Sequence, residues 1–294
     1  MTELLVTYPG GSTVERTTVL ALTRTDMGLL FAVERTPCHP ESPRWPDQPA
    51  DRCTLLLDGV ATPIECHEGV LREGELVLGE PEREAWAGAG AEPGAGVSDS
   101  APVRAERCVV HVAPSDLALE LGAEVTLEVD GPYREAISRN HSRCHLVSLA
   151  LNAALAGAWR KEQGTRDSLG SPDFDKLAIQ TSTISEGGSL DVYRIGKHVR
   201  KSGFSVEALE DPQALAREVA RIAGEWIASR PRMSISPAVS TLQERRTWSC
   251  PLPGATASFL CGGTHAPTIG PEDGLRVEIT WEPEEKRLAM SARG

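Results

Sequence analysis

The amino-acid sequence predicts an α+β fold in which a small N-terminal β-barrel precedes a second domain of helices and strands. Three observations support this prediction. Short β-forming runs divided by turn residues occupy roughly the first 130 positions, helical patterns appear only after them, and further strand-like stretches lie between and after the helices. The chain has 294 residues, which is long enough for two domains of the usual size.

The expected barrel consists of short strands that end at turn residues. Its first six strands are expected at Leu4 to Thr7, Thr17 to Leu22, Leu30 to Val33, Leu55 to Leu57, Leu76 to Leu78 and Cys108 to Val112. From Glu124 to Val129 polar and apolar residues alternate, which predicts one more strand with one buried face. Asp130-Gly131-Pro132 then breaks the pattern. We therefore expect a β-barrel domain over residues 1–130 and a second domain over residues 131–294.

One segment of the first domain has the composition of a loop. From Trp86 to Ser100 the chain consists mostly of Gly, Ala, Pro and small polar residues. Such a segment cannot bury enough apolar surface to offset the entropy lost when a chain becomes ordered. We expect a flexible surface loop near residues 86–100, inserted in the barrel without a functional role.

Two helices are expected in the second domain. The first runs from about Ile137 to Arg160, where apolar residues recur near helical spacing. The second starts at Asp211-Pro212, a capping residue followed by proline at the first helical position, and continues to Ile227. Strand-like stretches are expected at Ala257 to Leu260 and at Leu275 to Trp281. This segregation favours an α+β layer over a doubly wound sheet.

The composition argues against several classes of protein. The longest apolar run, Leu146 to Trp159, has 14 residues, whereas a membrane span needs about 20. Seven cysteines are scattered without a framework, so free thiols or metal ligands are expected. The net charge of −12 repels a polyanion at long range, although a local basic patch can still bind one. The N-terminus lacks a signal pattern, so we expect a cytoplasmic protein.

Two histidines and a later Cys/His pair form the pattern that carries chemistry. His141 and His145 are four residues apart on the first expected helix, so both imidazoles project from one face. Cys261 and His265 flank two glycines that let the backbone fold tightly enough for the side chains to converge. One thiolate and three imidazoles suit tetrahedral Zn²⁺ far better than Ca²⁺ or Mg²⁺. These four residues are therefore the predicted zinc ligands.

The remaining Cys and His residues show no second convergent set in the sequence. Cys38-His39 and Cys66-His67 are adjacent pairs whose side chains diverge, and Cys108 and His111, three apart on a strand, face opposite sides. We expect all of these residues to be structural. The sequence therefore predicts about one zinc ion per chain.

The strings NHSRCH and CGGTH, in this order, resemble the H-x-x-x-H and C-G-G-T-H motifs of the alanyl-tRNA editing proteins. These are freestanding relatives of the editing domain of alanyl-tRNA synthetase and of the related threonyl-tRNA synthetase domain. The resemblance covers most of the chain, including the leading barrel, the YRIGKHVRKSGF segment and the REVARIAGEWI helix. It implies that the second domain is an editing domain in which the four residues bind zinc. The implied activity is hydrolysis of mischarged tRNA, typically serine or glycine esterified to the tRNA for alanine.

Two further stretches carry parts of the resemblance. Family members of this length usually have a G-G-G-Q-x-x-D loop, and the corresponding stretch is WPDQPAD, where Gln48 and Asp51 match and the glycines do not. Gln48 is thus a candidate substrate-binding residue, or an ordinary loop residue. The segment SEGGS, from Ser185 to Ser189, resembles the S-Q-K-G-S stretch of synthetase editing domains. The hydroxyl of Ser185 or Ser189 is a candidate for recognising a serine side chain, although strand or turn residues explain the pattern equally well.

Basic residues gather between Val192 and Phe204, a segment that contains no acid. The candidates for binding tRNA phosphates are Arg194, Lys197, Arg200 and Lys201. Any enzyme that acts on tRNA must hold backbone phosphates, and these residues offer the necessary charge. A solvated charged face explains the same pattern without function.

The sequence identifies no catalytic residue and leaves three functions open. The first is a deacylase acting on mischarged tRNA for alanine, in which zinc either activates water or, as we favour, mainly positions the aminoacyl group. A zinc hydrolase of another ester or amide would keep the four ligands but not need the basic segment. A non-catalytic, zinc-containing tRNA-binding module would need the segment but no open metal position. The oligomeric state stays open.

Overall fold

The computed structural model describes residues 3–79 and 105–294, so the loop expected near residues 86–100 lies outside the described residues. The described part is a mixed α+β structure made mostly of strands, as predicted. Its helices are α1 (Gly131–Ala154), α2 (Phe174–Ala178), α3 (Lys197–Lys201) and α4 (Pro212–Ala228), with 3-10 turns at Tyr8–Gly10, Ala156–Ala158, Val206–Leu209 and Pro271–Asp273. None of the helices in these ranges is long and apolar enough to cross a membrane.

The chain divides into two compact units. The first contains Met1–Trp45, Pro49–Arg134 and Pro237–Glu244, and the second contains Pro46–Gln48, Glu135–Ser236 and Arg245–Gly294. Two short segments therefore belong to a different unit from the residues that flank them: Pro46–Gln48 to the second unit and Pro237–Glu244 to the first. Both segments are too short to show periodic hydrophobicity, so the sequence pattern does not predict that they belong to the other unit.

The first unit is organised around a sheet that closes on itself. Its strand order is β5 (Cys53–Leu57), β9 (Glu124–Val129), β2 (Val14–Thr25), β3 (Gly28–Val33), β8 (Ala105–Ala113), β6 (Val60–Arg72) and β7 (Glu75–Leu78). Closure comes from β6, because its first half pairs with β5 and its second half with β8. The enclosed apolar core includes Leu29, Phe31, Leu55 and Leu127.

The predicted barrel needs a correction, because the closed sheet is uneven. Eight residue pairs join β6 to β8, whereas three join β3 to β8. No strand was predicted for β6, which contains Pro63 and Gly69, two residue types that are rare in strand interiors. Gly69 is needed in the strand, because a Cβ there would lie 2.5 Å from the carbonyl oxygen of Val77. A separate small sheet joins β13 (Ser240–Thr241), β1 (Leu5–Val6) and β4 (Arg35–Thr36).

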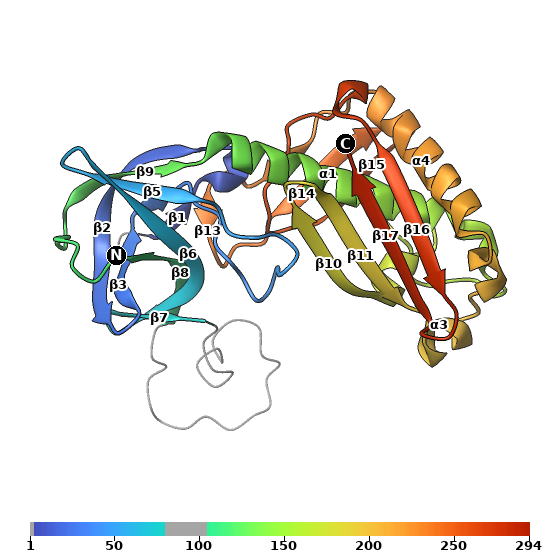
Figure 1. The fold of residues 1–294 in the computed structure, drawn as a ribbon, viewed down its shortest axis with the longest axis horizontal. Coiled ribbons are helices and arrows are strands. Elements are labelled where there is room, and N and C mark those ends of the chain that lie inside the picture. Colours follow the sequence, from blue (N-terminus) through green and yellow to red (C-terminus); the bar gives the residue numbers. More distant parts are fainter. Residues whose placement is uncertain (1–2, 80–104) are drawn as a thin grey trace. The chain divides into compact units, whose positions relative to one another are not determined.

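The second unit contains two antiparallel sheets. The larger has the order β10 (Ile179–Ser185), β11 (Gly188–Arg194), β17 (Arg287–Arg293) and β16 (Arg276–Glu282). The smaller has the order β12 (Ser234–Ser236), β14 (Thr247–Leu252) and β15 (Ala255–Leu260). Helix α4 lies along β16 (Figure 1). Its Leu215 and Val219 are buried in the same apolar cluster as Ile279 and Met290.

Helix α1 carries the two predicted histidine ligands. It begins at Gly131 rather than near Ile137, because the backbone N–H of Tyr133 donates a 3.0 Å hydrogen bond to Asp130 Oδ1 and so caps the first turn. The middle of the helix is covered on more than one side: Leu146 and Leu149 belong to one buried apolar cluster, and Val147 and Leu151 to another. This packing gives the histidines a rigid support.

Candidate metal centre

Helix α1 brings two of the predicted metal ligands together. The rings of His141 and His145 lie one helical turn apart, with centroids separated by 4.5 Å. His141 is buried, and His145 is partly exposed. The two imidazoles therefore project from the same face of the helix, as their spacing in the sequence requires.

The loop after β15 brings in the other two predicted ligands, Cys261 and His265. Its far end is tied to α1, because the backbone N–H of Ala266 donates a 3.1 Å hydrogen bond to Ser142 Oγ. A glycine is required at position 263, since a Cβ there would collide with the ring of His141. The tight approach expected from the paired glycines is thus present at Gly263.

The four donor atoms converge on one point. Cys261 Sγ lies 3.6 Å from His141 Nε2 and 3.4 Å from His145 Nε2. It lies 3.3 Å from His265 Nε2, and all four atoms are within 4.8 Å of one another. With Zn–S bonds of about 2.3 Å and Zn–N bonds of about 2.0 Å, a sulfur and a nitrogen ligand of a tetrahedral site are about 3.5 Å apart. The donor chemistry and the spacing both fit zinc.

Hydrogen bonds on the far side of two imidazoles fix their orientation. His141 Nδ1 donates to Gln48 Oε1 over 2.8 Å, since an amide oxygen only accepts. Gln48 is held in turn by Thr264, whose backbone N–H donates to Oε1 at 2.8 Å and whose Oγ1 accepts from Nε2 at 2.9 Å. His265 Nδ1 lies 3.2 Å from Ser142 Oγ. Such outer contacts keep Nε2 of each ring directed at the common point.

Gln48 is therefore engaged at both ends of its amide group and is buried. These contacts support a role in positioning His141, and the predicted contact of Gln48 with substrate stays a prediction. Asp51, which also matches the family stretch, belongs to the first unit. There its carboxylate forms a buried ion pair with Arg134.

Asp47 is a candidate functional residue that the sequence did not single out. Its Oδ2 lies 3.3 Å from His141 Nε2, and its side chain is 22% exposed. Burial raises the pKa of Asp47, but the hydrogen bond and charge of His141 outweigh burial and lower the pKa to about 2. Burial lowers the pKa of His141, but the charge of Cys261 and the contact with Asp47 raise it to about 10. The carboxylate of Asp47 and the sulfur of Cys261 thus both lie beside His141 Nε2, an arrangement that attracts a divalent cation.

Aromatic side chains form one wall of the site. The ring of His145 packs edge-on against Trp248 and Phe259, with centroid distances of 5.1 and 4.6 Å. Burial lowers the pKa of His145 well below its ordinary value, and the charge of His141 lowers it further. His145 is therefore held in the neutral form in which imidazole binds a metal.

The turn between β10 and β11 is fastened beside the ligand-bearing helix. Asn140 Nδ2 donates hydrogen bonds to the carbonyl oxygens of Ser185 at 2.7 Å and Glu186 at 2.9 Å. The backbone N–H of Ile184 donates to the carbonyl oxygen of Asp47 at 2.8 Å. The turn is therefore tied both to Asn140, the neighbour of His141 in the sequence, and to Asp47.

Ser185 and Ser189, the two residues predicted to recognise a serine side chain, differ in their exposure to solvent. Ser185 is exposed, and its hydroxyl donates a 3.2 Å hydrogen bond to the carbonyl oxygen of Gly188. Ser189 is buried beside the thiol of Cys144, which also contacts Asp191. Ser185 is thus the accessible one of the pair, and it belongs to the turn that adjoins the metal ligands.

The four predicted tRNA-binding residues lie on adjoining elements. Arg194 ends β11, and Lys197, Arg200 and Lys201 lie on α3. All four side chains are exposed. Within residues 3–79 and 105–294 none of them forms an ion pair with a carboxylate. Helix α3 attaches to the core through Val199, so its charged residues remain available to a polyanion.

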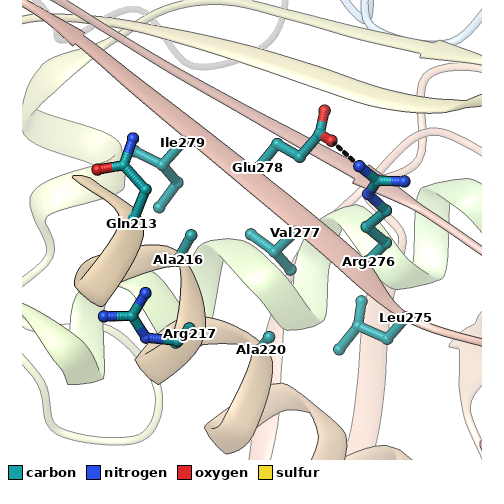
Figure 2. Close-up of a pocket in the computed structure, with 9 residues that line it drawn as sticks. All are labelled: Gln213, Ala216, Arg217, Ala220, Leu275, Arg276, Val277, Glu278 and Ile279. Atoms are coloured by element: carbon teal, nitrogen blue, oxygen red, sulfur yellow. Dashed lines mark ion pairs between the residues drawn. The ribbon is translucent and has the colours of Figure 1, made fainter.

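A separate hollow lies between α4 and the strand β16 (Figure 2). Its lining residues are Gln213, Ala216, Arg217, Ala220, Leu275, Arg276, Val277, Glu278 and Ile279. Arg276 and Glu278 form an ion pair over 2.6 Å within it. The lining includes no histidine or cysteine, so the hollow offers no set of donors for zinc.

Comparison with curated proteins finds similarity to an alanine–tRNA ligase of Chlorobium luteolum. The two sequences are 25% identical over 162 residues. This match covers 54% of the chain and 16% of the ligase, so the chain corresponds to a small part of that protein. No family model matches the chain.

Proposed function

We propose that this protein is a trans-acting aminoacyl-tRNA deacylase that hydrolyses mischarged tRNA for alanine, seryl-tRNA first and glycyl-tRNA second. The convergence of His141, His145, Cys261 and His265 at the spacing of zinc ligands carries the proposal. Similarity to part of an alanine–tRNA ligase supports the tRNA for alanine as the partner. Zinc held by the four side chains would position the aminoacyl group, the role that we favour, and would place positive charge near its carbonyl oxygen.

Asp47 is the residue that we assign to proton transfer. Its carboxylate adjoins His141 Nε2 and is partly open to solvent, so it can hold a water molecule beside the ester. Asp47 Oδ2 accepts the proton of this water as the water oxygen bonds to the carbonyl carbon. The ester bond to the tRNA then breaks, and the same proton passes to the departing ribose oxygen.

Ser185 is the residue that we assign to recognition of the seryl group. Its turn is hydrogen-bonded to Asn140 and to the backbone of Asp47, the residues that adjoin and contact His141, and its hydroxyl is accessible. A seryl hydroxyl can pair with Ser185, whereas an alanyl group covering the turn leaves a polar group unpaired at a cost of about 1 to 3 kcal/mol. A site that reads a hydroxyl in this way spares the correctly charged tRNA.

Replacing Arg194, Lys197, Arg200 and Lys201 together by alanine is expected to weaken tRNA binding and flatten its salt dependence. Each lost phosphate contact removes up to ~0.9 from the slope of log K against log salt for a duplex. The control is Arg221→Ala on α4, whose guanidinium is exposed but already paired with Glu218 and Glu225. Binding measured over a salt series checks the prediction, and a quadruple variant with the wild-type slope would show that α3 is only a solvated face.

Zinc analysis combined with a deacylation assay distinguishes the proposed function from its alternatives. The proposal expects zinc-dependent release of serine from tRNA and slower release when the four basic residues are removed. Equal rates on seryl-tRNA and on a simple serine ester, unaffected by those residues, would indicate a zinc hydrolase of another substrate. Tight tRNA binding with zinc present and no hydrolysis would indicate a binding module.

A further inference from the structure

Three cysteines of the first unit converge although they are far apart in the sequence. Cys38 follows β4, Cys53 begins β5 and Cys66 lies within β6. Their Sγ atoms are all within 4.8 Å of one another, and each residue is at most 5% exposed. The expectation that the remaining cysteines form no second convergent set is therefore wrong.

The strand register explains why these side chains meet. Cys53 of β5 pairs with Ile64 of β6. Cys66 lies two residues further along β6, so its side chain points to the same face as that of Ile64. On the other side of β6, Cys66 lies directly opposite His111 of β8. Rigid paired strands thus hold two thiols and one imidazole on one face of the closed sheet.

His111 has the hydrogen bonding of a metal-binding histidine. Its Nδ1 lies 3.3 Å from the carbonyl oxygen of Phe31, and a carbonyl only accepts, so Nδ1 carries the proton of the neutral ring. Nε2 then carries the lone pair, which accepts from the hydroxyl of Thr36 at 2.9 Å. The imidazole also contacts the thiol of Cys38. A backbone carbonyl on Nδ1 is the partner that metal-binding histidines often have, and Nε2 would exchange the Thr36 hydroxyl for the ion.

The three thiols lie in an apolar core, where Cys38 hydrogen-bonds with Cys53 and Cys66. Burial raises the pKa of Cys38, but hydrogen bonds with Cys53, Cys66 and His111 outweigh burial and lower it well below its ordinary value. Burial raises the pKa of Cys66. Cys108 lies on β8 outside the cluster, and its pKa is raised to about 12, mainly by burial. Cys38 is therefore the one thiol of the cluster that favours the thiolate, because the pKa values of Cys53 and Cys66 are both raised.

We propose that the converging thiols of Cys38, Cys53 and Cys66 bind a structural zinc ion in the first unit, distinct from the site at His141, with His111 Nε2 as the fourth ligand once it exchanges the Thr36 hydroxyl for the ion. Three thiolates and one imidazole form a closed tetrahedral donor set, with no position left for substrate. Soft sulfur ligands exclude Ca²⁺ and Mg²⁺. Binding displaces the remaining thiol protons to solvent, and the ion links β5, β6, β8 and the segment after β4. This site is independent of the proposed deacylase activity.

The zinc content of the full-length protein, purified without chelator, tests the proposal. We expect about two zinc ions per chain in the wild type and in the control Cys108→Ser. Cys66→Ser and Cys261→Ala are each expected to lose about one ion, from different sites. Wild-type zinc content in folded Cys66→Ser overturns the proposal. A wild-type content of about one ion that disappears in Cys261→Ala overturns it as well.

A second measurement applies if Cys66→Ser does not fold. In full-length Cys261→Ala loaded with Co²⁺, the site at His141 has lost its thiolate, so thiolate-to-cobalt absorption comes from the three-cysteine cluster. The proposal expects a strong charge-transfer band in this variant, and the absence of the band overturns it. The band does not depend on deacylation, so failure of this inference and failure of the proposed function give different results.

Discussion

Replacing Cys261 by alanine is expected to release zinc from the site at His141 and to slow deacylation of seryl-tRNA by at least about a hundredfold. Loss of an outer partner of a metal ligand already costs about 10- to 100-fold in affinity or activity, and loss of a ligand removes more. Cys261 has a further importance, because its Sγ lies within 3.6 Å of all three imidazole nitrogens. Metal analysis and single-turnover deacylation of the same preparation check this prediction.

Cys250→Ala is the matched control for this prediction. Cys250 lies on β14 in the same unit, and burial raises its pKa to about 12, as for an ordinary core thiol. The control variant is expected to keep both the zinc and the rate, after allowance for a small loss of stability from the missing sulfur. Unchanged zinc content and unchanged deacylation in folded Cys261→Ala would contradict the ligand assignment.

Replacing Asp47 by asparagine is expected to lower kcat for deacylation by about 10²- to 10⁴-fold, the usual contribution of a positioned acid or base. The amide is almost the same size as the carboxylate and still fits beside His141, but it does not accept a proton from water. Zinc content is expected to remain at the wild-type level, because Asp47 is not one of the four donors. KM is expected to change little, since we assign tRNA binding to the basic residues on and beside α3.

Asp58→Asn serves as the control for the same change of charge. Asp58 is exposed in the turn between β5 and β6 and belongs to the first unit. This variant is expected to retain the wild-type rate. A wild-type kcat in Asp47→Asn would remove Asp47 from the mechanism, and loss of zinc together with activity would instead make it a residue that supports metal binding.

Local patterns in the sequence were sufficient for the presence of the two long helices α1 and α4, but not for the short helices α2 and α3, and they were sufficient for the convergence within each ligand pair. Helix α4 was predicted from its Asp-Pro start, and in the structure Asp211 accepts a 2.8 Å hydrogen bond from the N–H of Ala214. The spacing of His141 and His145 is equally local, because one helical turn determines it. The meeting of the helix pair with Cys261 and His265 was implied by the resemblance and by donor chemistry rather than by any local rule.

Contacts between segments remote in sequence were not predictable in this way. Asp47 contacts His141 because the short segment Pro46–Gln48 belongs to the second unit. A segment of three residues shows neither periodic hydrophobicity nor a helix cap, so the sequence does not predict this contact. The only available signal was the position of Asp47 next to Gln48. The cluster of Cys38, Cys53 and Cys66 depends on the register of β5 and β6. Strand β6, which contains a proline and a glycine, was not predicted from the sequence.

The most direct test of the central claim is the rate at which the full-length protein deacylates the tRNA for alanine charged with serine, glycine or alanine. Our account predicts rapid release of serine, because its hydroxyl pairs with the turn at Ser185, and little release of alanine, because its methyl group covers the turn without pairing. Glycine, which has no methyl group to cover the turn, is expected to be released more slowly than serine. Equal rates on seryl- and alanyl-tRNA would contradict recognition of the hydroxyl. No activity on any of the three, with the zinc site filled, would contradict the deacylase function itself.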